Sequence, residues 1–226
     1  DEVDKTSSVK FTHQADLSGT VRYWTNQTGT STRRYGGDGG LAVQAQLNFP
    51  TAVAADREGN FYIADTMNHR VRMVDSNTGI ISTLAGTGQA RFSGDGGPAD
   101  QAALNEPAAL AVDDEGRVYI ADQSNHRVRV VDPKTGVILT VAGTGIATYD
   151  GDGKLAVDTA LAGPSGLALR DNRLYIADTF NGRVRCVDLS LGLMTTVAGD
   201  GGVYRYESPD APSPSLSRPT GIAFDH

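Results

Sequence analysis

The chain has 226 residues, a formal net charge of −7 and 39% hydrophobic residues. This acidic balance argues against a nucleic-acid partner, because phosphate binding needs a basic surface. No apolar run approaches the roughly 20 residues that a membrane-spanning helix requires. A single cysteine, Cys186, excludes an internal disulfide framework.

The same short sequence segments recur along the chain with a period of 57 residues. GDGG occurs at 37–40 and 94–97, and GDGK occurs at 151–154. YIAD occurs at 62–65, 119–122 and 175–178, so its second step is one residue shorter. A proline precedes each following apolar run, at Pro50, Pro107, Pro164 and Pro219. A fixed period of this size predicts a propeller, a solenoid or an array.

Each unit contains four short runs that are typical of strands. In the first complete unit the runs are 51–55, 61–64, 70–74 and 80–85. Polar or glycine-containing turns separate them, and patterns with the period of a helix are nearly absent. Four antiparallel strands joined by short turns predict a propeller blade, so the expected fold is an all-β propeller. In the link that follows, Pro98-Ala99-Asp100 predicts one helical turn.

The two ends of the chain are complementary parts of one further unit. Residues 19–36 align without a gap on 69–86, so 10–36 would supply the second to fourth strands of a blade. Residues 219–225 match only a first strand. We therefore expect one domain over 1–226, with repeats at about 50–106, 107–163 and 164–218 and a split blade of 10–36 plus 219–225. The ring then has four blades, and the alternative is a fragment of a six-bladed propeller.

The antiparallel order predicts which loops share one end of a blade. The link between units and the turn between the second and third strands emerge together, and loops on a rigid scaffold are where binding residues concentrate. This loop face is the predicted binding surface. Its candidate residues are Asp65, Asn68, His69, Arg70, Asp122, Asn125, His126, Arg127, Asp178, Asn181 and Arg183.

Recurrence of these residues in every complete unit also favours a structural role. The repeated aspartate can cap its own turn, and the repeated arginine can pair with it. His69 and His126 have no third counterpart, because Gly182 takes that place. Two histidines on adjacent blades could approach a metal ion, although metal sites normally use three or four ligands.

The combination of YIAD, the D-x-x-N-x-R-V-R-x-V-D pattern and a following AG resembles the NHL repeat. The second unit spells Asp122-Gln123-Ser124-Asn125-His126-Arg127. The long GDGG-containing form resembles that of bacterial NHL proteins and teneurin-like surface proteins. The resemblance implies a β-propeller, typically six-bladed, that serves as a binding platform. Relatives include amidating lyases that use metal ions and RNA-binding members with a basic face.

The sequence favours a non-enzymatic binding scaffold whose loop face engages a protein, peptide or glycan. No catalytic motif is visible, and no catalytic residue, metal or cofactor is predicted. The alternative is a metal-dependent lyase or hydrolase with its site at the mouth of the central channel. The inner runs carry mostly small residues, such as Thr51-Ala52-Val53, which favours the scaffold. The sequon at Asn26 favours an extracellular or cell-surface location.

Overall fold

The computed structural model of the protein describes residues 35–202 and 216–225. Nearly all of the region predicted to supply three strands of the split blade, 10–36, lies outside these ranges. Closure of a four-bladed ring by that region therefore stays a prediction.

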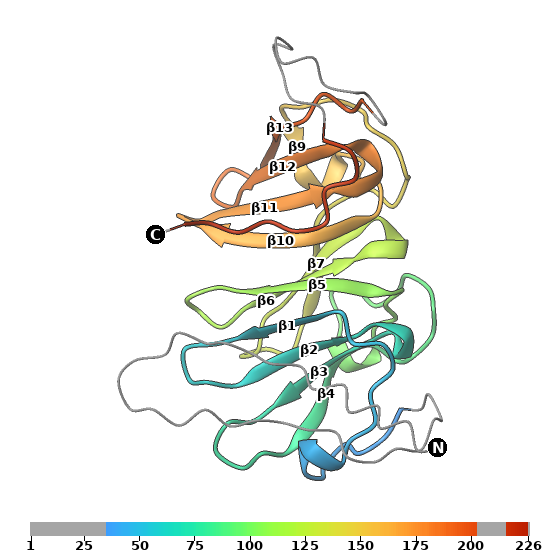
Figure 1. Cartoon of the computed structure of the whole chain (residues 1–226), viewed down its shortest axis with the longest axis vertical. Coiled ribbons are helices and arrows are strands. Elements are labelled where there is room, and N and C mark those ends of the chain that lie inside the picture. Colours follow the sequence, from blue (N-terminus) through green and yellow to red (C-terminus); the bar gives the residue numbers. More distant parts are fainter. Residues whose placement is uncertain (1–34, 203–215, 226) are drawn as a thin grey trace, which may run out of the picture.

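Three antiparallel sheets, two of four strands and one of five, follow one another along the long axis of the molecule (Figure 1). We call them blades 1, 2 and 3. Only strands and 3-10 helices are assigned in the described part of the chain, which confirms the all-β class. Blade 1 contains β1 (Ala52–Ala55), β2 (Phe61–Asp65), β3 (Arg70–Val74) and β4 (Ile81–Ala85). Blade 2 contains β5 (Pro107–Val112), β6 (Val118–Asp122), β7 (Arg127–Val131) and β8 (Ile138–Ala142). Blade 3 contains β10 (Pro164–Arg170), β11 (Arg173–Asp178), β12 (Arg183–Asp188) and β13 (Leu193–Ala198), with the short β9 (Lys154–Leu155) added beside β13.

Single turns of 3-10 helix occur at the same two places in each repeat. One precedes the first strand, and the other joins the second strand to the third. The first kind includes the turn predicted after Pro98, which is confirmed. These elements are η1 (Ala42–Gln44), η3 (Ala99–Gln101) and η5 (Ala156–Asp158), then η2 (Thr66–Asn68), η4 (Gln123–Asn125) and η6 (Thr179–Asn181).

Each link packs on two blades at once. The Ala99 N–H donates to the Gly136 carbonyl of the blade that follows, and the Gly86 N–H at the end of the preceding blade donates to the Ala99 carbonyl. Gly136 belongs to the β7–β8 hairpin, so the middle of the link runs along β8. The Arg91 carbonyl accepts from Asn125 and the Asn105 N–H donates to Asp122, so the flanks of the link lie at the end of the sheet that carries the turn between the second and third strands, as the antiparallel order predicts. This end is the loop face, and the opposite end carries the β-hairpins.

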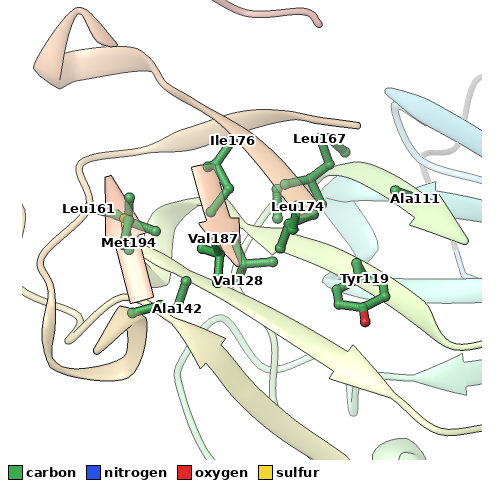
Figure 2. Close-up of a cluster of buried hydrophobic side chains, with 13 residues drawn as sticks. Ala111, Tyr119, Val128, Ala142, Leu161, Leu167, Leu174, Ile176, Val187 and Met194 are labelled. Atoms are coloured by element: carbon green, nitrogen blue, oxygen red, sulfur yellow. The ribbon is translucent and has the colours of Figure 1, made fainter. Parts of the chain in front are cut away.

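The hydrophobic core lies between neighbouring sheets. Figure 2 shows Tyr119 and Val128 of blade 2 among Leu174 and Ile176 of blade 3, and these four belong to one buried cluster. A second cluster joins blades 1 and 2. Because the middle blade is covered on both faces, every residue of β6 is buried, and the strand does not alternate between buried and exposed residues.

The last described residues lie beside blade 3 in the way that blade 2 lies beside blade 1. The Pro219 carbonyl accepts a hydrogen bond from Thr179 Oγ1 at 2.8 Å, as the Pro107 carbonyl does from Thr66 Oγ1. The Phe224 ring meets the Tyr175 ring edge-on, with centroids 4.9 Å apart. The strand predicted at 219–225 is nevertheless not assigned, because no ladder of backbone hydrogen bonds joins it to another strand in the described part of the chain.

Candidate binding face at the loop end of the blades

The aspartate that ends each YIAD segment organises the turn after it. Asp65, Asp122 and Asp178 are fully buried. One carboxylate oxygen accepts a backbone N–H from the link at 2.7 Å in all three blades. The other accepts the side-chain amide of the asparagine three residues later, at 2.8 Å. The candidate residues Asp65, Asp122, Asp178, Asn68, Asn125 and Asn181 therefore hold the loops in place.

The YIAD aspartates pair with a different set of arginines from the one predicted. The pairing arginines stand two positions after the candidate arginines and are fully buried: Arg72, Arg129 and Arg185. Their guanidinium groups lie 3.4 to 3.6 Å from the YIAD aspartates. Each also pairs with the aspartate of the Gly-Asp-Gly segment, at 2.5 Å between Arg129 and Asp95 and 2.9 Å between Arg185 and Asp152. The third such pair is Arg72 with Asp38.

The pKa values of the YIAD aspartates and of Asp38 are shifted in opposite directions. Burial raises the pKa of Asp122 to about 6, against hydrogen bonds from Asn125 and Asn105 and the charge of Arg129. Burial also raises the pKa values of Asp65 and Asp178. At Asp38 burial is outweighed by hydrogen bonds from Tyr35 and Thr83 and by Arg72, so its pKa is lowered. The deeper carboxylates are thus costly to ionise, and arginines compensate them.

The candidate arginines Arg70, Arg127 and Arg183 also bind the protein itself. Each donates to a backbone carbonyl of the link that follows its own blade: Thr87 at 2.7 Å, Thr144 at 2.6 Å and Asp200 at 2.8 Å. Each guanidinium also lies over an aromatic ring, 3.7 to 3.8 Å from its centre. The rings are Tyr35, Phe92 and Tyr149.

The two candidate histidines join neighbouring blades and do not point to one shared site. His69 Nδ1 accepts the backbone N–H of Glu106 at 3.1 Å, and His126 Nδ1 accepts that of Gly163 at 3.1 Å. Both histidines have a left-handed backbone conformation, with φ of 52° and 54°. Burial, followed by the charge of Arg127 and opposed by Asp178, lowers the pKa of His126.

Two positions of the loop face differ from blade to blade and hold large exposed side chains in blades 1 and 3. Before the recurring proline stand Phe49, Glu106, Gly163 and Arg218, and in the middle of the short turn stand Met67, Ser124 and Phe180. Phe49 is 66% exposed, Met67 46% and Phe180 51%. Sequence reasoning missed these residues, because it selected positions that recur. Comparing the repeats for positions that change would have found them.

The changing positions are matched to each other within a blade. In blade 2 the Ser124 hydroxyl donates to the Glu106 carboxylate at 2.6 Å. In blade 3 the Phe180 ring occupies the place where a Cβ on Gly163 would stand. The guanidinium of Arg218 lies 5.7 Å from the centre of the same ring. These positions therefore hold two apolar residues, Phe49 and Met67, in blade 1, a serine bonded to a glutamate in blade 2, and an aromatic ring beside a cation at blade 3.

A groove of about 460 Å³ lies at the opposite end, between blades 2 and 3. Its lining includes Asp114 and Glu115 of the β5–β6 hairpin and Asp171 and Asn172 of the β10–β11 hairpin. The second hairpin turns on Asp171 and Asn172, with φ of 50° and 57°. It is one residue shorter than its counterpart in blade 2, which explains the shorter repeat step.

Two further observations concern the whole described region. Within residues 35–202 and 216–225, no three His, Cys, Asp or Glu side chains are grouped to hold a metal ion. The same residues contain no helix that is long and apolar enough to cross a membrane.

Curated relatives match part of this chain. SUPPRESSOR OF QUENCHING 1, chloroplastic, of Arabidopsis thaliana is 35% identical over 103 residues, covering 46% of this chain and 10% of that protein. NHL repeat-containing protein 2 of Gallus gallus is 35% identical over 106 residues, covering 46% and 14%. Teneurin-4 of Homo sapiens is 38% identical over 104 residues, covering 40% and 4%. The matched region thus spans no more than 14% of any of these relatives.

Solved structures share the fold. An auxiliary nutrient binding protein from Bacteroides ovatus superposes with a TM-score of 0.59 at 20% identity, over 80% of this chain and 44% of that one. A protein of unknown function from Bacteroides thetaiotaomicron gives 0.59 at 24% identity, over 78% and 42%. The family model of the teneurin NHL domain matches residues 21–93 and 88–148, more than half of the chain. The chain therefore belongs to the NHL-repeat family, as a β-propeller protein of the teneurin NHL domain type.

Proposed function

We propose that this protein is a non-enzymatic binding scaffold whose loop face engages a protein, peptide or glycan partner. The blades supply rigid support, and the partner contacts the exposed side chains at the positions that change between repeats. The auxiliary nutrient binding protein with the same fold is a precedent for a propeller that binds a ligand.

The observation that carries this proposal is the division of the loop face into two sets of residues. Residues that recur in all three blades are buried or bonded to the protein, as Asp122 and Arg129 are. Residues that differ include large apolar side chains in water, above all Phe49 and Phe180. Exposed aromatic residues in a polar surrounding are typical of recognition surfaces. The candidate histidines and arginines act in this proposal by positioning those side chains.

A direct test screens the labelled protein against a peptide array and a glycan array. The double variant Phe49→Ser, Phe180→Ser is compared with Leu191→Ser, whose side chain is 65% exposed in the β12–β13 turn at the hairpin end. We expect array members that bind the native protein to lose at least about tenfold in affinity for the double variant, equivalent to about 1.4 kcal/mol. Leu191→Ser should bind as the native protein does.

Circular dichroism melting checks that both variants fold. Binding that survives the loss of Phe49 and Phe180 would contradict the proposal. So would an equal loss in Leu191→Ser, because that variant changes only the hairpin end.

A further inference from the structure

Two of the joints between blades include a hydrogen bond to an imidazole nitrogen. His69 stands at the end of η2 in blade 1 and accepts the Glu106 N–H, which directly precedes β5 of blade 2. His126 stands at the end of η4 in blade 2 and accepts the Gly163 N–H, which directly precedes β10 of blade 3. The distance is 3.1 Å in both. The same contact thus occurs twice, one repeat apart.

The contact requires an unprotonated Nδ1. A neutral imidazole has one acceptor nitrogen, and a protonated imidazole has two donors and no acceptor. A proton on Nδ1 would place a second N–H against the backbone N–H of the next blade. Hydrogen bonding of this kind therefore fixes the neutral form, with the proton on Nε2.

The backbone at these positions favours few residues other than histidine for this role. A positive φ is uncommon outside glycine, and asparagine, aspartate and histidine tolerate it best. The third joint shows the alternative. Gly182 has the same conformation, with φ of 60°, and a Cβ there would stand 2.7 Å from the Leu216 carbonyl oxygen. No side chain fits, so this joint has no imidazole.

We propose that His69 and His126 form acid-sensitive hydrogen bonds between blades, each of which persists only while the imidazole is neutral. Mild acid releases the Glu106 and Gly163 amides from the two imidazoles, at the points where the chain enters blades 2 and 3. The joint at Gly182 does not respond to acid in this way. This acid sensitivity does not depend on whether the loop face binds a partner.

The charges around His126 influence the pH at which its joint is released. His126 is flanked on its own blade by Arg127, which disfavours protonation, and faces Asp178 of blade 3, which favours it. Burial adds to the effect of Arg127, and together they lower the pKa of His126. His69 has Arg70 on its own blade. In blade 2 the acidic residues at this joint are Glu106, whose carboxylate accepts from Ser124, and Asp122, which corresponds to Asp178 in the repeat.

The sign follows from the lowered pKa of His126. The neutral form is favoured in the folded state, so its stabilising contribution is complete above the unfolded value of 6.5. It is lost as pH falls from there through the folded pKa. The raised pKa values of Asp65, Asp122 and Asp178 act in the opposite direction on global stability. A measurement resolved by residue is therefore needed, because a melting temperature would sum both effects.

The experiment measures amide hydrogen exchange by NMR at Glu106 and Gly163 between about pH 7.5 and about pH 5, with intrinsic rates divided out. Two variants replace His126 without disturbing the left-handed backbone. His126→Asn offers a side-chain carbonyl oxygen in place of Nδ1 and does not titrate. His126→Gly offers no acceptor. Glu106 in both variants reports the untouched His69 joint.

In the native protein we expect protection of Gly163 to fall by up to about tenfold for each pH unit below the pKa of His126. His126→Asn should keep Gly163 protected with no dependence on pH, and His126→Gly should leave it unprotected throughout. Protection that is flat with pH in the native protein would overturn the proposal. A slope in His126→Asn equal to the native one would overturn it as well.

Discussion

At the scale of single residues, each blade is held together by one buried arginine between two aspartates. Arg129 shows the arrangement: it pairs with Asp95 and Asp122 and donates to the carbonyls of Ser93 and Ala103. Removing a charge from water is expensive, so such a group is stable only when it is paired with opposite charges and hydrogen-bond acceptors. The repeated arginine therefore couples the link to the sheet that follows it.

Replacing that arginine should destabilise the fold. In Arg129→Met the aspartates at 95 and 122 lose their cation, and breaking a buried pair in this way costs about 3–5 kcal/mol. Urea denaturation measures the change in the free energy of unfolding. The matched control is Arg57→Met, which breaks an ion pair with Asp114 whose side chains are 70% and 75% exposed. The control should cost less than about 1 kcal/mol.

A similar loss in both variants would show that burial of the pair is unimportant. That result would remove the structural role assigned to the recurring aspartates, and those residues would again be candidates for direct contact with a partner.

At the scale of elements, the glycine after each fourth strand lets the link turn back over the sheet. Gly86, Gly143 and Gly199 have φ between 84° and 100°. A Cβ at Gly143 would overlap the carbonyl oxygen of His126 and stand 2.9 Å from the Cα of Arg127. Contact this close is repulsive, so the tight approach of link and turn requires glycine.

A methyl group at Gly143 should therefore lower the free energy of unfolding by more than the strained backbone conformation alone would. We expect Gly143→Ala to lower the free energy of unfolding by about 2–3 kcal/mol, because strain and overlap add. Gly136→Ala separates the two causes, since Gly136 also has a positive φ, 70°, but nothing lies within 4 Å of the place that an added methyl group would take. That control should cost about 1 kcal/mol. Equal midpoints in thermal denaturation would contradict the close approach.

Elements defined by local patterns could be predicted from the sequence. The strands, the turn after Pro98 and the shared end of links and turns all follow from alternation, turn residues and chain direction. The choice of buried arginine could not be predicted. Arg70 and Arg72 both lie near the Tyr35 ring, so the ring does not distinguish them. The two differ because Arg72 pairs with Asp38, which is 34 residues earlier in the chain, and a local pattern cannot show a contact at that separation. The strand at 219–225 stays a prediction, because its predicted partner strands in 10–36 lie almost wholly outside the described residues.

At the scale of the whole molecule, the repeats separate support from recognition. Each blade contacts only its neighbours, so positions that serve packing are the same in all blades, whereas a binding surface has no such requirement. The exposed residues Phe49, Met67 and Phe180 can therefore serve partner recognition, whereas the buried residues that recur in every blade serve packing. The sequence alone could not show this, because exposure depends on which loops cover which.

The most direct test of this division is a map of where a partner lies. Amide hydrogen exchange is measured with and without an array member that binds the native protein. We expect slower exchange at Met67, Ser124 and Phe180 on the loop face and no change at the hairpins 113–117 and 170–173. Slowing confined to those hairpins would place recognition at the opposite end of the blades and contradict the account.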